Sequence, residues 1–248
     1  MSEDPRLLEL AANLRTVRNR IDAACAAAGR APATLIVVTK FFGPDDVRRL
    51  AALGVSDVGE NRDQEAAAKQ AECGDLALRW HFIGQLQTNK ARSVVRYADL
   101  VHTVDRPSLV RALDKAAANL GKCQDVLVQV NLDPQVRPER GGVAPDDLPD
   151  LLDRLQACAA LRVRGVMGVA PLDEDPEPAF ARLAQIAASV RQDLPGADIL
   201  SAGMSSDWEV AVAYGATHLR IGTAVMGSRP TVGYRQPKGG KHNEGEAQ

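Results

Sequence analysis

Short runs of aliphatic and β-branched residues alternate along the chain with longer amphipathic stretches. Eight of these runs have the length and composition of β-strands. A stretch with the pattern of a helix follows each of the first seven, and the eighth ends the alternation. The predicted strands cover residues 35–40, 55–60, 78–84, 100–105, 124–132, 162–170, 199–204 and 218–223. The predicted helices between them cover residues 44–53, 61–73, 88–97, 107–120, 148–155, 180–194 and 207–214.

This alternation of strand and helix predicts a single (β/α)8 TIM barrel, because parallel strands need crossovers and eight strands close a sheet. An extra helix precedes the first strand and carries apolar residues at helical spacing: Leu7, Leu10, Leu14, Val17 and Ile21. We expect residues 1–228 to form the barrel domain. Residues 229–248 are polar and rich in helix and strand breakers, so we expect a tail without stable structure.

The side-chain alternation along residues 124–132 assigns the two faces of the barrel wall. The valines of this strand share one face, and the other face carries Leu127, Gln129 and Asn131. We expect the valines to lie beneath the helices. The polar pair then points into the barrel near its open end.

The composition narrows the possible function classes. The chain has 248 residues and a formal net charge of -2, which is neither the basic footprint of a nucleic-acid-binding protein nor a polybasic membrane anchor. Its four cysteines lie far apart without nearby histidines, so we expect reduced packing residues and no metal site. The N-terminus lacks the pattern of a signal peptide, and no apolar stretch approaches membrane-spanning length. We therefore expect a cytoplasmic monomer with small soluble partners.

The most informative single residue is Lys40, which ends the apolar run at residues 35–40. Alternation places Lys40 on the same face as Ile36 and Val38, at the carboxyl end of the strand. Barrel active sites lie at this end, and a lysine amine among apolar neighbours is the nucleophile that forms a Schiff base with an aldehyde. The alternative is a solvated lysine whose stem packs on the strand while its amine stays in water.

A second candidate group follows the seventh strand, in a region where barrels commonly bind phosphate. Residues 203–209 place small hydroxyl residues, Ser205 among them, at a strand-to-helix turn where free backbone amides attract an anion. The alternative is purely structural, because Ser206 and Glu209 also have the spacing of a helix capping box.

The eighth strand carries Arg220 and Gly222 on the face that points into the barrel. An arginine in a barrel mouth must meet an anion, a carbonyl or an aromatic nitrogen. The glycine lets a ligand approach the backbone, and Thr223 adds a hydroxyl beside it. The alternative pairs Arg220 with an acidic neighbour such as Glu60.

Two further polar residues belong to the second and third strands. Asn61 follows the second strand, and it is either the N-cap of the next helix or a ligand contact. His81 lies within the third strand, where we expect a hydrogen-bonded structural histidine rather than a base.

A lysine amine, a phosphate-binding turn and a partner for a ring nitrogen are the parts that a pyridoxal 5'-phosphate (PLP) site requires. The chain resembles the pyridoxal 5'-phosphate homeostasis proteins, the YggS/PROSC (PLPBP) family, over nearly all of residues 5–229. The matching motifs are VTK at 38–40, VGEN at 58–61, WHFIGQLQTNK at 80–90, VN at 130–131, LSAGMSSD at 200–207 and LRIGTAVMG at 219–227. The motifs at 80–90 and 219–227 are highly specific to that family.

The resemblance implies a barrel like the amino-terminal domain of alanine racemases, with PLP held as a Schiff base on Lys40. The other implied cofactor contacts are Asn61 beside the ring, Arg220 at the pyridine nitrogen, and Ser205, Gly222 and Thr223 at the phosphate. The implied function is homeostasis of PLP, which the protein binds and delivers without sustained catalysis. The implied partners are PLP-dependent apo-enzymes and free amino acids.

Two enzymatic functions are the alternatives. A PLP-dependent racemase or decarboxylase of this type adds a second domain with a catalytic tyrosine, and the tyrosines here lie at no predicted strand end: Tyr97, Tyr214 and Tyr234. An aldolase that uses Lys40 without a cofactor needs a second lysine or an acid partner inside the barrel. The sequence indicates no such pair.

Overall fold

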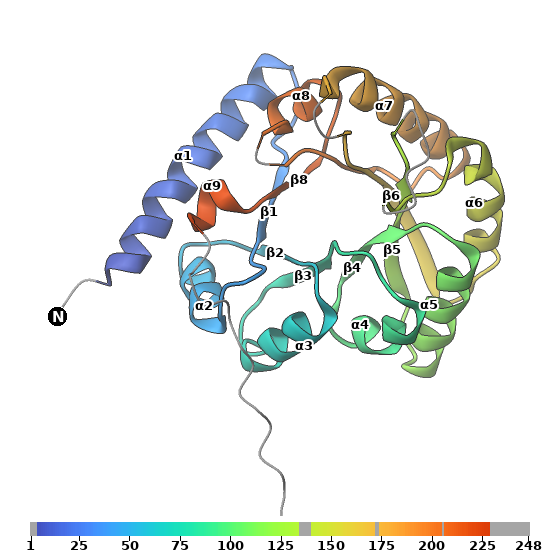
Figure 1. The fold of residues 1–248 in the computed structure, drawn as a ribbon, viewed down its shortest axis with the longest axis horizontal. Coiled ribbons are helices and arrows are strands. Elements are labelled where there is room, and N and C mark those ends of the chain that lie inside the picture. Colours follow the sequence, from blue (N-terminus) through green and yellow to red (C-terminus); the bar gives the residue numbers. More distant parts are fainter. Residues whose placement is uncertain (1–3, 134–139, 172–173, 205, 229–248) are drawn as a thin grey trace, which may run out of the picture.

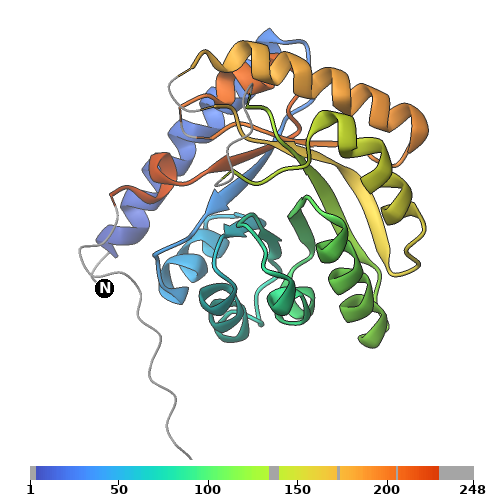
Figure 2. The same cartoon turned by 45° about the vertical axis from the view of Figure 1, so that its right-hand side comes forward.

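The structure is a computed structural model, and it describes residues 4–133, 140–171, 174–204 and 206–228. Within these residues, eight parallel strands form one closed barrel in chain order, with the last strand paired to the first (Figures 1 and 2). The predicted (β/α)8 barrel is therefore confirmed. The strands are β1 (Thr34–Val38), β2 (Asp57–Glu60), β3 (Arg79–Phe82), β4 (Leu100–Val104), β5 (Gln124–Val130), β6 (Leu161–Gly168), β7 (Ile199–Ser201) and β8 (His218–Ile221).

Helices connect the strands and form a ring around the barrel (Figure 1). Several begin with proline in the first turn, where the missing amide proton has no helical partner to lose. The helices that follow strands are α2 (Pro44–Ala52), α3 (Asp63–Glu72), α4 (Ala91–Tyr97), α5 (Pro107–Asn119), α6 (Leu148–Gln156), α7 (Pro176–Asp193), α8 (Trp208–Ala213) and α9 (Thr223–Met226), with short 3-10 turns at Thr88–Lys90 and Pro145–Asp147.

The extra helix α1 (Pro5–Ala27) lies outside this ring beside α8 and α9 (Figure 1). Its predicted apolar stripe is confirmed for Leu10, Leu14, Val17 and Ile21, which are buried, whereas Leu7 is only partly buried. The side chain of Asn13 donates to the carbonyl of Val225 at 3.0 Å, which ties α1 to the end of the barrel chain.

The core has an outer layer between helices and sheet and a smaller inner layer inside the barrel. The valines of β5 belong to the outer layer, as predicted. Leu127 points inward and packs with Leu100, Met167 and Ile199. The predicted faces of β5 are confirmed, and the polar residues at its open end lie beside a small cavity.

The strands end earlier than the sequence pattern suggested at the edge that carries the predicted site. β1 ends at Val38, two residues before Lys40, because the chain turns at Phe41, whose φ is 76°. β7 ends before Gly203, whose φ is 87°. Lys40, Asn61 and Gly222 therefore lie just after the strand ends, whereas Arg220 lies within β8 and Thr223 begins α9.

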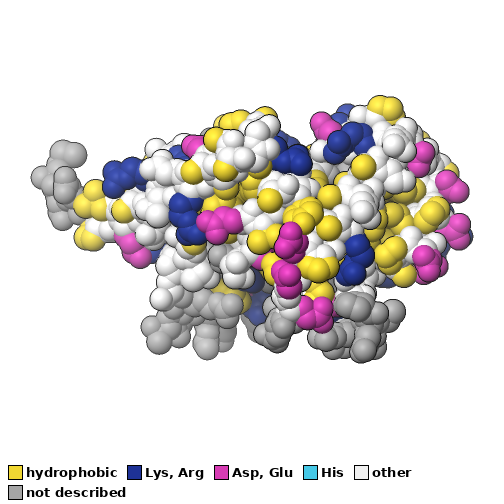
Figure 3. Space-filling view, turned by 90° about the horizontal axis from the view of Figure 1, so that it is seen from above, with side chains coloured by type: hydrophobic (Ala, Val, Ile, Leu, Met, Phe, Trp, Pro, Cys, Tyr) yellow, Lys and Arg dark blue, Asp and Glu magenta, His cyan; other side chains and the backbone are white. Residues whose placement is uncertain are grey.

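The described surface mixes charges of both signs. On the face in Figure 3, Lys and Arg side chains lie among Asp and Glu, and neither sign forms a continuous band. Among the described residues, no helix is long and apolar enough to span a membrane. All four cysteines are free, but the prediction that they are packing residues is wrong for Cys123, which is exposed. The predicted tail at 229–248 lies outside the described residues.

Candidate functional site

A cavity of about 270 Å³ opens at the carboxyl ends of the strands and brings together five of the six predicted site residues. Ser205, the sixth, lies outside the described residues. The rest of the lining is mainly apolar. The predicted residues in the lining are Lys40, Asn61, Arg220, Gly222 and Thr223.

Lys40 lies in a tight turn directly after β1. The amide of Phe42 donates to the carbonyl of Thr39 at 3.1 Å, and Phe41 between them has positive φ. This position of a turn favours glycine, and a bulky residue there costs about 1–3 kcal/mol. The ring of Phe41 lies near two cations, with its centroid 5.9 Å from the Nζ of Lys40 and 5.4 Å from the Cζ of Arg62. Lys40 is half-buried, with its side chain at the cavity.

A buried ion pair anchors this turn. Glu60 accepts hydrogen bonds from the hydroxyl of Thr39 and from the ammonium of Lys69, each at 2.6 Å. The ammonium of Lys69 also donates to the carbonyl of Thr39 at 2.9 Å. Burial raises the pKa of Glu60, against the opposing effect of the Lys69 charge and of both hydrogen bonds. The suggested pairing of Arg220 with Glu60 is therefore wrong, because Lys69 is the partner of Glu60.

Arg220 reaches the same cavity from inside the barrel. Its Nη1 donates to the hydroxyl of Ser201 at 2.6 Å, and its Nη2 donates to the carbonyl of Gly168 at 2.9 Å. Burial lowers the pKa of Arg220 to about 10, so the guanidinium stays charged at neutral pH. None of its hydrogen-bond partners among the described residues is a carboxylate. A buried cation of this kind is a strong site for a ligand acceptor or anion.

Asn61 enters the cavity from the loop between β2 and α3. It is not the N-cap of α3, because Arg62 occupies that position and no side chain caps the helix. Its backbone is fixed by close packing against Gly84, where a Cβ would lie 2.1 Å from the carbonyl oxygen of Asn61. The Oδ1 of Asn61 is buried and lacks a hydrogen-bond partner among the described residues. The side-chain amide therefore has capacity for a ligand.

The turn after β7 is held by Asp207. Its Oδ1 accepts from the backbone amide of Met204 at 2.6 Å, and no side chain caps α8. The alternative interpretation of Ser206 and Glu209 as a capping box is therefore wrong.

The turn after β8 carries Gly222 and Thr223 into the cavity. The first hydrogen bonds of α9 run from the amides of Val225 and Met226 to the carbonyl of Gly222. The amide of Thr223 precedes them and has no partner within the helix. Backbone amides in this position suit a phosphate oxygen.

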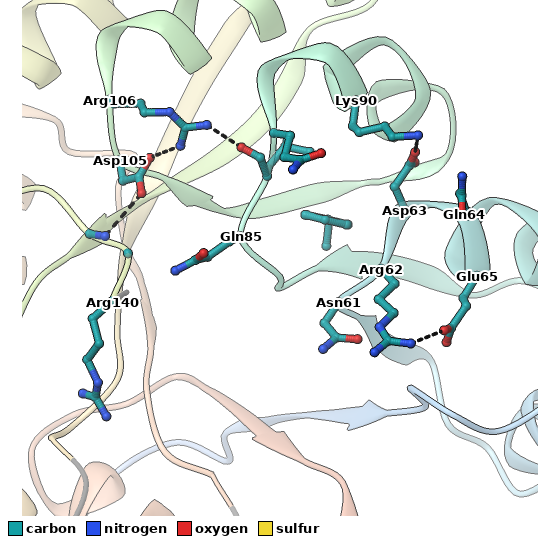
Figure 4. Close-up of a pocket in the computed structure, with 15 residues that line it drawn as sticks. Asn61, Arg62, Asp63, Gln64, Glu65, Gln85, Lys90, Asp105, Arg106 and Arg140 are labelled. Atoms are coloured by element: carbon teal, nitrogen blue, oxygen red, sulfur yellow. Dashed lines mark hydrogen bonds and ion pairs between the residues drawn. The ribbon is translucent and has the colours of Figure 1, made fainter. Parts of the chain in front are cut away.

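A second cavity, of about 700 Å³, adjoins the first and shares Asn61 with it (Figure 4). Gln85 lies at the centre of this cavity wall, between the two groups of charged residues labelled in Figure 4. Sequence analysis did not predict that the charged residues lining this second cavity lie together. Its cations each lie within ion-pair distance of an acid, in the pairs Arg62–Glu65, Lys90–Asp63, Arg106–Asp105 and Arg140–Asp133.

Comparison with known proteins assigns this arrangement to a family. Residues 7–230 match the family model of the alanine racemase N-terminal domain. A pyridoxal phosphate homeostasis protein of Mycobacterium tuberculosis is 42% identical over 243 residues, which cover 89% of this chain and 93% of that protein. The chain belongs to the family of pyridoxal phosphate homeostasis proteins.

Solved structures agree with membership of the pyridoxal phosphate homeostasis family. PipY of Synechococcus elongatus, solved with PLP bound, has a TM-score of 0.77 and 37% identity, with coverage of 88% of this chain and 100% of that chain. Alanine racemase from Streptomyces coelicolor has a TM-score of 0.73 at 21% identity, so it shares the fold. This chain covers 58% of that racemase.

Sequence analysis missed several residues that position the side chains of this site. Lys69 lies in a helix predicted as polar, and nothing in its spacing reveals that it is fully buried. His102 and Ser201 lie on separate strands, 99 residues apart, yet their side chains are in contact at 3.0 Å. Alternation along β4 and β7 places both side chains on the inner face of the barrel, and it was the one feature of the sequence that could have indicated the contact.

Proposed function

We propose that the protein binds PLP in the cavity between Lys40 and Arg220 and takes part in PLP homeostasis in the cytoplasm. The observation that carries the proposal is that Lys40 and Arg220 both line one cavity. Lys40 supplies a nucleophilic amine, and Arg220 supplies a buried cation whose described protein partners are a hydroxyl and a carbonyl. The resemblance to PipY, which was solved with PLP bound, supports the choice of ligand.

The residues present fit this cofactor. Lys40 is the amine that would hold the aldehyde carbon, and the backbone around Gly222 and Thr223 would hold the phosphate, together with Ser205. Arg220 would donate a hydrogen bond to the ring nitrogen, and the open amide of Asn61 would lie beside the ring. When bound, PLP supplies an aldehyde that condenses reversibly with amines and a ring that withdraws electrons from them.

Storage and delivery fit the site better than turnover. Arg220 only donates hydrogen bonds, so it disfavours a proton on a ring nitrogen that faces it, and the ring then withdraws electrons weakly. Among the described residues, no tyrosine lines the cavity. The hydroxyl of Tyr214 instead donates to Glu177 at 2.6 Å, and Tyr97 is buried in α4. Among the described residues that line the cavity, Lys40 is thus the base that could take a proton from an amino acid bound at this ring.

The first test is a spectroscopic titration of the purified protein with PLP. We expect a visible absorbance band that saturates with added PLP in the wild type and is abolished in Lys40→Ala. Lys90→Ala is the matched control, because Lys90 lines the adjoining cavity but not this one. A wild type that develops no band contradicts the proposal, as does a Lys40→Ala variant that keeps it.

The rival function, an amino-acid racemase, is tested by NMR of L-alanine in deuterated water with the PLP-loaded protein. We expect slow α-deuteration and no build-up of D-alanine. Sustained formation of D-alanine at about 1–1000 turnovers per second, the ordinary range of enzymes, would favour the racemase.

A further inference from the structure

A continuous line of hydrogen-bonded side chains crosses the barrel interior and ends on Arg220. It begins at Asp57 on β2 and passes through His81 on β3, His102 on β4 and Ser201 on β7. The contacts are 2.8 Å from Asp57 Oδ1 to His81 Nε2, 2.9 Å from His81 Nδ1 to His102 Nε2, 3.0 Å from His102 Nδ1 to Ser201 Oγ, and 2.6 Å from Ser201 Oγ to Arg220 Nη1.

If both imidazoles are neutral, the two ends of this line fix the direction of every hydrogen bond in it. A guanidinium only donates and a carboxylate only accepts. Arg220 therefore donates to Ser201, and the Ser201 hydroxyl is left to donate to His102 Nδ1. His102 then donates from Nε2 to His81, which donates from Nε2 to Asp57. With both histidines neutral, each carries its proton on Nε2, and every ring nitrogen has a partner.

Burial favours this neutral arrangement. The five residues are between 0% and 4% exposed. Burial lowers the pKa of His102 well below its usual value, and the charge of the nearby Arg220 acts in the same direction. For Asp57, burial acts to raise the pKa, but hydrogen bonds from His81 and Ser56 outweigh it and lower the pKa. A buried polar network with every member paired holds its side chains rigidly.

We propose that Asp57, His81 and His102 are positioning residues that act through Ser201 to fix the guanidinium of Arg220 at the cavity. The line of hydrogen bonds engages Nη1, and the carbonyl of Gly168 engages Nη2. The plane of the guanidinium is thereby set, and its remaining N–H groups are left for a ligand acceptor. As a statement about PLP recognition, this inference rests on the proposed function of the cavity. As a statement about Arg220, it is testable without a ligand.

The ligand-free test is NMR of protein labelled with ¹⁵N at histidine and arginine, with Arg220→Lys to assign the Arg220 signals. We expect His81 and His102 to be neutral with the proton on Nε2 near pH 7. We also expect separate Nη signals for Arg220, because a held guanidinium rotates slowly. A proton on Nδ1 of either ring overturns the proposed direction of the hydrogen bonds, and averaged Nη signals overturn the fixed guanidinium.

Variants then separate positioning from simple packing. His102→Phe keeps a ring but removes both nitrogens, whereas the side-chain amide of His102→Gln can still accept and donate. His218→Phe is the matched control, because His218 is also buried inside the barrel, with its ring centroid 6.3 Å from that of His81, but bonds to Thr217 instead. We expect His102→Phe to average the Nη signals of Arg220, and His102→Gln and His218→Phe to keep them separate.

The same variants connect the positioning to the ligand. We expect His102→Phe to weaken PLP binding about threefold to tenfold, the effect of losing one or two neutral hydrogen bonds, and His218→Phe to change it less than about twofold. Equal effects of His102→Phe and His218→Phe on both the Nη signals and PLP binding would overturn the inference. A wild type that binds no PLP would instead refute the proposed function, and the Nη signals would still decide whether Arg220 is held.

Discussion

Replacement of Lys69 by methionine should destabilise the protein strongly. Methionine keeps most of the length of the side chain but removes the ammonium that lies 2.6 Å from Glu60 Oε1. The side chains of the pair are 0% and 1% exposed, so water cannot replace the lost partner. The variant therefore leaves a buried carboxylate whose remaining described donor is the hydroxyl of Thr39.

The size of the effect follows from this burial. Removing one partner of a buried ion pair costs about 3–5 kcal/mol, which is a large part of the roughly 5–15 kcal/mol that stabilises a typical domain. The variant also removes the hydrogen bond from Lys69 to the carbonyl of Thr39, which precedes Lys40. We therefore expect weaker PLP binding together with the loss of stability.

The loss should depend on pH with a definite sign. Burial already raises the pKa of Glu60 from 4.5, and Lys69 opposes that rise. Without Lys69, the folded state holds the Glu60 proton at pH values where the unfolded state has released it. Stability then falls as the pH rises above about 4.5, so the deficit of Lys69→Met should be smaller near pH 5 than near pH 8.

Urea unfolding of four proteins tests this reasoning. Lys90→Met is the control for losing a lysine charge at a partly exposed pair, 3.8 Å from Asp63, and should cost less than about 1 kcal/mol. The double variant Glu60→Gln/Lys69→Met should be more stable than Lys69→Met alone, since it removes the stranded charge. A cost below about 1 kcal/mol for Lys69→Met, equal to that of the control, would refute the buried-pair argument.

Three further predictions concern the site and the barrel interior. Gly84→Ala should destabilise the fold by about 1–3 kcal/mol and weaken PLP binding, because its Cβ would lie 2.1 Å from the carbonyl oxygen of Asn61; unchanged urea unfolding would contradict this. Burial lowers the pKa of His218 from 6.5 to about 4, so about 3 kcal/mol of stability should be lost as the pH falls from 6.5 to 4. His218→Gln should therefore flatten the pH dependence of unfolding, and an unchanged dependence would contradict this assignment to His218. Ser205→Ala combined with Thr223→Val should weaken PLP binding in equilibrium dialysis more than either change alone, and an unchanged affinity would place the phosphate elsewhere.

Much of the barrel could be predicted from the sequence because its signals are local. Alternation along β5 identified which side chains face the helices. The same rule predicted that Lys40, Arg220 and Gly222 point to the same side, and all three line one cavity. The strand ends could not be predicted in the same way. Apolar residues continue past the last paired residue, and turns such as the one at Phe41 end the strand without a glycine or proline to mark it.

The polar partners inside the fold were beyond local reasoning. Arg220 was expected to meet an acid such as Glu60, but these two side chains lie on opposite faces of the barrel wall. Glu60 pairs with Lys69 of α3, and Arg220 pairs with Ser201 inside the barrel. His81 was correctly expected to be a bonded structural histidine, yet its partners come from two other strands. The contacts inside the barrel join strands that are far apart in the sequence, and the Glu60–Lys69 pair depends on how α3 packs on β2. Neither can be deduced from the pattern of one segment alone.

The central claim is that Lys40 holds PLP in this cavity. The most direct measurement is borohydride reduction of the PLP-loaded protein, followed by peptide mapping with mass spectrometry. The account predicts one modified lysine, in the peptide that contains Lys40, and no modification of that peptide when borohydride is omitted. Modification at another lysine such as Lys90, or no stable modification at all, would contradict it.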